Sequence, residues 1–226
     1  MNATRPFVVF TGTMFSGKTD LLCQTLRRLS TYSHQRVVVF KPTTDRRSSN
    51  GHIQTADGVQ MPAHEIKPNR PEKILRMVYQ MKADGNNPDV LGFDEIQFFF
   101  PALFAAVTAE LYREGYQIYA AGLDLDFRGE PFETASLLLA HATYIHKLES
   151  YCARCGQPAR LPQRLIEGSP ASYTADRILI GGTEAYEARC TACHVVPDRP
   201  SVVTVSIAPH HTRKKKHKRD KKKRPF

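Results

Sequence analysis

Short apolar runs alternate with amphipathic segments through most of the chain. The four apolar residues at 7–10 predict a buried strand, and leucines at positions 21, 22, 26 and 29 have the spacing of a helix that follows it. Further strands are predicted at 36–40, 59–63, 90–95, 117–123 and 143–148, and further helices at 71–81, 101–114 and 135–140. Strands that alternate with helices are typical of a mainly parallel sheet with helices on both faces.

A glycine-rich stretch joins the first strand to the first helix. Residues 12–19 read GTMFSGKT, which matches the pattern G-x-x-x-x-G-K-[S/T] completely. The glycines let backbone N–H groups point at a phosphate, and a helix N-terminus favours an anion. Lys18 would add a positive charge for the outer phosphates, and the Thr19 hydroxyl can ligate Mg²⁺. The pattern predicts a nucleotide site in an α/β fold of the P-loop NTPase type.

Two carboxylates, Asp94 and Glu95, close the strand predicted at 90–95. In a fold with a phosphate loop, an acid at this place lies beside the bound metal, so we expect Asp94 to serve Mg²⁺ directly or through water. Glu95 should point away from Asp94, because neighbouring strand residues face opposite ways, and it is then available to a second substrate. The phenylalanines at 98–100 either pack in the core or wall a pocket for a flat ligand.

Four of the five cysteines form two C-x-x-C pairs, Cys152 with Cys155 and Cys190 with Cys193. Each pair can offer two thiolates from one turn, and two pairs complete a tetrahedral structural Zn²⁺ site. Free buried thiols or a redox pair are the alternatives, and His194 is a substitute ligand that four cysteines do not require. The 34 residues between the pairs are long for a structureless loop, and a segment tethered by metal at both ends suits a lid over a small ligand.

The net charge of +10 is concentrated near the C-terminal end. Residues 213–224 hold ten Lys or Arg and one Asp, which leaves the rest of the chain near +1. Such a block repels itself, and we expect it to be disordered. It either contacts nucleic acid or another polyanion, or is a solvated end without a partner. No apolar run of about 18 residues and no leader pattern is present, so we expect a cytoplasmic protein without a membrane span.

Several motifs together resemble one family. GTMFSGKT, DEIQFF, GLDLDFRGEPF, CxxCG and IGGxxxYxxxCxxC occur in the order and spacing of the type II thymidine kinases, over about residues 5–194. The resemblance implies that the γ-phosphate of ATP passes to the 5′-hydroxyl of thymidine or deoxyuridine, giving dTMP, in an enzyme that is typically a homotetramer. We expect a P-loop kinase domain at 1–148, a zinc-ribbon and lasso domain at 149–198 and a largely disordered basic tail at 199–226.

The resemblance also implies roles for individual residues. ATP and its Mg²⁺ would be bound by Gly12, Thr13, Met14, Phe15, Ser16, Gly17, Lys18, Thr19, Asp45 and Asp94. Glu95 looks like the general base that takes the proton of the 5′-hydroxyl. The nucleoside would contact Met14, Phe98, Leu123, Phe127, which stacks on the base, Phe132, Tyr186 and the backbone of Arg177, Ile178, Leu179, Ile180 and Gly181. Cys152, Cys155, Cys190 and Cys193 match the zinc ligands of the family. The segment 46–58 and the tail after about residue 208 depart from the family pattern.

Two other functions fit parts of the sequence. A different small-molecule phosphotransferase would differ only in its pocket. A nucleic-acid-binding NTPase would grip a polymer with the zinc module and the basic tail, and it would need basic residues along that module as well as at the end of the chain. Glu95, the aromatic residues and the tethered segment favour a buried small ligand.

Overall fold

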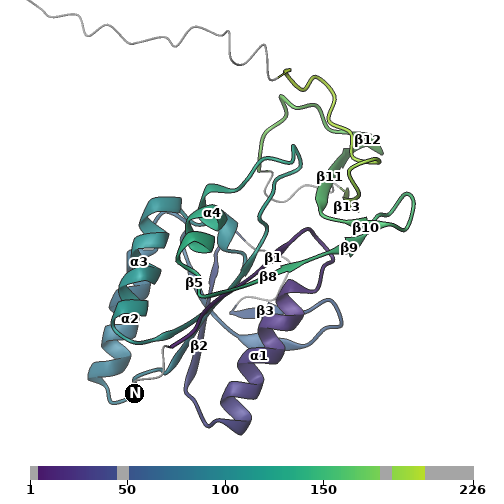
Figure 1. The fold of residues 1–226 in the computed structure, drawn as a ribbon. Helices are drawn as coiled ribbons and strands as arrows, with labels where there is room; N and C mark the ends of the chain where they lie inside the picture. The colour runs from purple at the N-terminus through teal and green to yellow at the C-terminus, as the bar shows by residue number, and fades with distance from the viewer. Residues whose placement is uncertain (1–4, 45–50, 179–184, 202–226) are drawn as a thin grey trace, which may run out of the picture.

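A six-stranded sheet forms the centre of the computed structural model, which describes residues 5–44, 51–178 and 185–201 (Figure 1). The strands lie in the order β5-β2-β6-β7-β1-β8, and every neighbouring pair is parallel. They are β1 Phe7–Gly12, β2 Val37–Pro42, β5 His64–Ile66, β6 Val90–Phe93, β7 Gln117–Gly122 and β8 Tyr144–Leu148. Because the carboxyl ends of parallel strands share one edge, the segments that follow β1, β6 and β7 meet there.

Helices cover both faces of this sheet (Figure 1). They are α1 Lys18–Tyr32, α2 Glu72–Ala83, α3 Pro101–Arg113 and α4 Glu133–His141. On the face of α2, α3 and α4, the rings of Phe40, Phe93 and Phe104 are fully buried. On the opposite face, α1 buries Leu26 and Cys23 together with a hairpin, β3 His52–Gln54 and β4 Gln60–Pro62. The prediction of an α/β fold with a mainly parallel sheet and helices on both faces is confirmed.

The region after β8, where we expected a zinc-ribbon and lasso domain, contains small antiparallel sheets whose individual strands the sequence did not predict. The first consists of β9 Ser150–Tyr151 and β10 Pro158–Ala159, and the second consists of β12 Ser169–Pro170, β11 Leu161–Ile166 and β13 Ala185–Arg189 in that order. These strands are short and their local apolar alternation is weak, so the pairing depends on contacts distant in sequence. In Figure 1 they lie together beyond one end of the main sheet.

Several predicted features lie outside the described residues. They are Asp45, the segment 46–50, the lasso residues Leu179, Ile180 and Gly181, and the basic tail from 202 onward. The described part of the departing segment 46–58 runs into the hairpin of β3 and β4. Among the described helices, none combines the length and apolar character that crossing a bilayer requires.

Candidate active site

The phosphate loop joins β1 to α1 at the carboxyl edge of the sheet. Its first glycine, Gly12, has φ 141°, and a Cβ there would lie 2.1 Å from the carbonyl oxygen of Leu148. Its last glycine, Gly17, has φ 77° and directly precedes Lys18, where the helix begins. The path of the backbone therefore requires both glycines. The N-terminus of α1 faces the loop, which favours an anion at this place.

Polar side chains of the loop converge on Thr13. Lys18 Nζ donates a hydrogen bond to the Thr13 carbonyl oxygen over 2.6 Å, and Ser16 Oγ donates to the same oxygen over 2.8 Å. The Thr13 hydroxyl is buried and has no hydrogen-bond partner among the described residues. A lysine folded over the loop and a buried hydroxyl without a partner both suit phosphate oxygens. Met14 is half-buried, whereas the Phe15 side chain is 74% exposed.

Asp94 lies directly after β6 and contacts the start of α1. Its carboxylate is buried, and the Thr19 hydroxyl lies 3.3 Å from each of its two oxygens. Asp94 Oδ1 also accepts the backbone N–H of Glu95 over 3.0 Å. The structure thus brings together the two predicted metal-site side chains, Thr19 and Asp94. A hydroxyl and a carboxylate are oxygen ligands of the kind that Mg²⁺ prefers.

Glu95 lies in a turn after β6, so strand alternation does not apply to it. The strand β6 already ends at Phe93, and Glu95 has φ 52°, a left-handed conformation, just before a short 3-10 helix, η1 Ile96–Phe98. This conformation is costly for a residue that is not glycine, so its surroundings must hold it in place. The two carboxylates have different partners, Thr19 for Asp94 and Gln97 for Glu95, and Glu95 lies in a turn and not in the strand.

Gln97 holds the Glu95 carboxylate from the side of β7. Its Nε2 donates to Glu95 Oε2, and its Oε1 accepts the backbone N–H of Leu123 over 3.0 Å. A Cβ on Gly122 would lie 2.5 Å from Gln97 Oε1, so glycine leaves the space that this amide occupies. Gln97 is 4% exposed. Sequence reasoning gave it no role, and the only local signal is an amide two residues after the acid.

The residues expected to wall the base pocket come from η1 and from the loop after β7. Phe98 and Leu123 are half-buried, and Phe127 and Phe132 are buried. Phe127 is only 2% exposed, so little of its ring is open to a stacking base in this structure. These residues lie on segments that follow β6 and β7 at the carboxyl edge of the sheet, while the base pocket and the stacking role of Phe127 stay predictions.

Two guanidinium groups accompany Phe127. The Cζ atoms of Arg128 and Arg164 each lie 5.4 Å from the centroid of its ring. Arg164 belongs to β11, where it pairs in register with Tyr186 of β13. Tyr186 is half-buried, and Ile178, the last described residue before 179–184, is 40% exposed. The small sheets thus reach the loop that carries Phe127.

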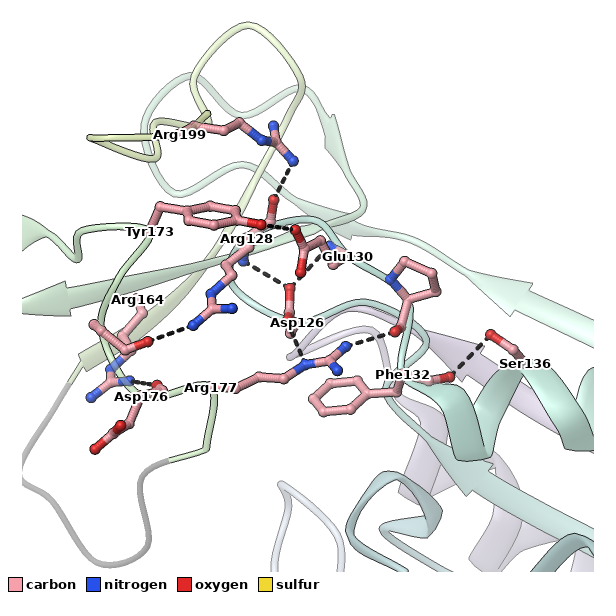
Figure 2. Close-up of polar contacts among 12 residues, drawn as sticks. Asp126, Arg128, Glu130, Phe132, Ser136, Arg164, Tyr173, Asp176, Arg177 and Arg199 are labelled. Atoms are coloured by element: carbon pink, nitrogen blue, oxygen red, sulfur yellow. Dashed lines mark hydrogen bonds and ion pairs between the residues drawn. The ribbon is translucent and has the colours of Figure 1, made fainter. Parts of the chain in front are cut away.

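The loop 124–132 is tied to the segment 173–178 by charged side chains, shown in Figure 2. Two arginines make the connections: Arg177 donates to the Asp126 carboxylate and to the Pro131 carbonyl, each over 2.6 Å, and Arg128 donates to the Ala175 carbonyl over 2.7 Å. Arg164 of β11, whose guanidinium group lies over the Phe127 ring, donates to the Asp176 carbonyl over 2.6 Å. Sequence reasoning assigned no role to Asp126, Arg128 or Arg164, and for Arg177 it considered only the backbone.

The four predicted cysteine ligands lie together. Their sulfur atoms are all within 4.8 Å of one another, and the sulfurs of Cys155 and Cys190 are 3.6 Å apart. Each pair sits in a turn, with N–H donation from Gly156 to the Cys152 carbonyl and from His194 to the Cys190 carbonyl. The His194 ring bonds instead to the Phe127 carbonyl over 2.9 Å. Four sulfurs at this spacing could hold a structural metal such as zinc.

The thiols of this cluster differ in acidity. Burial opposes ionisation of Cys152, but backbone N–H donors from Cys190 and Arg154 lower the pKa of Cys152 to about 6. Hydrogen bonding to the Cys155 and Cys190 side chains raises the pKa of Cys193 to about 12. Four thiolates would repel one another unless a cation compensated their charge. The donor set therefore fits a divalent metal that ionises its ligands on binding.

A solved structure and a family model both match this chain. The chain resembles the crystal structure of domain III of the Thermotoga maritima replication initiation protein DnaA at 17% identity and a TM-score of 0.37, covering 66% of this chain and 57% of that one. The family model for thymidine kinase matches residues 6–194. That match includes the phosphate loop, the Asp94–Glu95 turn, the loop after β7 and all four clustered cysteines. The chain therefore belongs to the thymidine kinase family.

Proposed function

We propose that this protein transfers the γ-phosphate of ATP to the 5′-hydroxyl of thymidine or deoxyuridine, giving dTMP in nucleotide salvage. The observation that carries the proposal is the contact of Thr19 with Asp94, 3.3 Å apart, beside the buried Glu95. Phosphoryl transfer needs positioning and charge neutralisation more than covalent help, and this edge of the sheet supplies both. Family membership supports the nucleoside as the acceptor.

The ATP side of the site rests on the phosphate loop. Residues 12–19 would hold the phosphates through backbone N–H groups and the Lys18 ammonium group. Thr19 and Asp94 would hold Mg²⁺, which offsets phosphate charge when ATP is bound. We propose Asp45, outside the described residues, as a further acid on this side.

Glu95 would accept the proton of the 5′-hydroxyl. The proton leaves late in a loose phosphoryl transfer, so a carboxylate of ordinary basicity suffices. Gln97 would act as a positioning residue, because its amide links the Glu95 carboxylate to the backbone of Leu123. That link fixes the carboxylate relative to β7 and to the loop proposed to contact the nucleoside.

Replacing Gln97 by alanine should lower kcat about 10- to 100-fold, because small displacements of a reacting group are costly. The KM for ATP should stay close to that of the wild type, since the phosphate loop is untouched. Steady-state kinetics with thymidine and ATP measures both. Gln60→Ala is the matched control, because the Gln60 amide makes an exposed 3.4 Å contact with Gln54, far weaker than the buried contacts of Gln97. Wild-type kcat in Gln97→Ala, or a raised KM for ATP, would contradict the positioning role.

The nucleoside would lie between the loop after β7 and the lasso. Met14, Phe98, Leu123, Phe127 and Phe132 would wall the base, with Phe127 stacked on it once the ring is uncovered. The backbone of 177–181 and the Tyr186 side chain would complete the enclosure. A pocket sized for a pyrimidine excludes purines by clash, and enclosure limits wasteful transfer to water.

The wider organisation follows the same proposal. We propose a kinase domain at 1–148, a zinc-binding lasso domain at 149–198 and a basic tail at 199–226. Zn²⁺ on the four cysteines would be structural, because all four metal positions are filled by sulfur. We also propose a cytoplasmic homotetramer whose tail contacts nucleic acid or another polyanion.

A panel of nucleosides with labelled ATP tests the function. Thymidine and deoxyuridine should be phosphorylated at the 5′ position, whereas purine nucleosides should not. The same reactions with single-stranded DNA should proceed at unchanged rates. ATP hydrolysis that depends on single-stranded DNA, without a phosphorylated nucleoside, would support a nucleic-acid-binding NTPase instead.

A further inference from the structure

We propose that Asp126, Arg177 and the Pro131 carbonyl form a latch that sets the affinity for the nucleoside. The latch joins the segment 173–178, which is the described start of the lasso, to the loop 124–132 after β7. We name these three groups the Asp126 latch. The proposal rests on the proposed function, because it concerns closure of the site that would hold the nucleoside. Neither side chain needs to touch the nucleoside for the latch to act.

Asp126 is the buried anchor of the latch. Its side chain is 1% exposed, and its two carboxylate oxygens accept hydrogen bonds from different donors. Oδ1 accepts the backbone N–H groups of Arg128 and Glu130, each over 2.9 Å, which shapes the loop itself. Oδ2 accepts Arg177 Nε over 2.6 Å, which links the loop to the lasso. A carboxylate buried to this degree is stable only when paired, so release of Arg177 carries a cost.

Arg177 commits its guanidinium group to the loop. Besides Asp126, it donates through Nη2 to the Pro131 carbonyl over 2.6 Å, and its Cζ lies 4.9 Å from the centroid of the Phe132 ring. These contacts span the turn from Asp126 to Phe132, as Figure 2 shows. A planar, two-armed cation suits this arrangement better than lysine would. The Arg177 side chain therefore binds other groups of the protein, whereas its backbone is the first of the residues 177–181 that we propose hold the nucleoside.

Further contacts hold together the two segments that the Asp126 latch joins. Arg128 lies over the Tyr173 ring at 4.8 Å, and the Tyr173 hydroxyl donates to Glu130. Together with the carbonyl contacts of Arg128 and Arg164, these interactions bring the segment 173–177 against the loop that carries Phe127. The Asp126–Arg177 contact is the direct ion pair across this junction among the described residues. Its loss should loosen the junction without removing the other contacts.

Asp126→Asn and Arg177→Met test the latch. Asparagine keeps an acceptor for the loop N–H groups but removes the charge, and methionine keeps the apolar stem of arginine without its donors. Each variant should raise the KM for thymidine about tenfold, whereas kcat and the KM for ATP stay near wild type. The double variant should be no worse than either single variant, because both remove the same interaction. Arg177→Lys should recover part of the lost affinity, since it keeps the charge.

Amide hydrogen exchange provides a readout that does not depend on catalysis. Residues 173–178 should exchange faster in Asp126→Asn and Arg177→Met than in the wild type. Arg113→Met is the matched control, because the contacts that it removes, with Glu110 and with the Ala109 carbonyl, are exposed and lie within α3. A merely structural role would instead lower the zinc content and would reduce kcat.

Failure of the latch can be told from failure of the proposed function. A wild type that does not phosphorylate thymidine refutes the function, and hydrogen exchange then still tests the latch. A wild type that is active, with unchanged thymidine KM in both variants, refutes the latch alone. Unchanged exchange at 173–178 refutes it in either case.

Discussion

Replacing Glu95 by glutamine should lower kcat about 10²- to 10⁴-fold while the binding of ATP and thymidine is retained. Glutamine has nearly the shape of glutamate, and its carbonyl oxygen can still accept the Gln97 amide. The fold around the turn should therefore persist, but the side chain can no longer take up a proton. Single-turnover phosphorylation measures the chemical step, and calorimetry with thymidine and a non-hydrolysable ATP analogue measures binding.

The control for this substitution is Glu110→Gln. Glu110 is an exposed acid on α3 whose side chain pairs with Arg113, so its neutralisation should leave turnover unchanged. Near-normal turnover of Glu95→Gln would remove Glu95 from the role of base. Loss of thymidine binding together with turnover would assign Glu95 to substrate binding.

Removal of the metal should abolish nucleoside binding but preserve ATP binding. The four cysteines draw together the turn between β9 and β10 and the turn that follows β13, and binding of structural zinc contributes about 10–16 kcal/mol in small zinc-finger peptides. Small sheets of this size cannot hold their shape without such a staple. The phosphate loop belongs to the main sheet, which has its own core. ATP affinity should therefore outlast the loss of zinc.

The experiment measures zinc content and the binding of both substrates in Cys155→Ser and in chelator-treated protein. Cys23→Ala is the control, because Cys23 lies on α1 and is buried in the core between that helix and the main sheet, which is a different cluster from that of Cys152. It should retain zinc and nucleoside binding with a small loss of stability. An active protein without metal would show that the lasso holds itself in place.

The four inner strands of the central sheet, β2, β6, β7 and β1, were predictable because they are largely buried on both faces and therefore appear as continuous apolar runs, whereas the edge strand β5 was not predicted. All six residues of β1 are buried, for example. The exposure of the edge strand β8 was harder to predict. It was expected as a strand of the core, yet Tyr144 and Ile145 are 62% and 50% exposed. Local pattern indicates a strand but does not say how many neighbours it has.

The motif-bearing residues were also predictable, since phosphate and metal binding require fixed residue types at fixed spacing. The residues that position these motif residues and loops could not be predicted. Gln97 contacts Leu123, 26 positions away, and Arg177 contacts Asp126, 51 positions away. Such long-range pairs produce no periodic pattern in the sequence, and a single glutamine or aspartate does not indicate which residue it will contact.

The position of β1 dictates when the protein can fold during synthesis. β1 lies between β7 and β8, and the backbone of Phe7 bonds to Thr143, 136 residues later. On the ribosome, the first strand therefore waits unpaired, with its apolar side chains accessible to chaperones, until nearly the whole sheet has emerged. Because Gly12 packs against the Leu148 carbonyl, a nascent chain that stops before β8 has no finished nucleotide site.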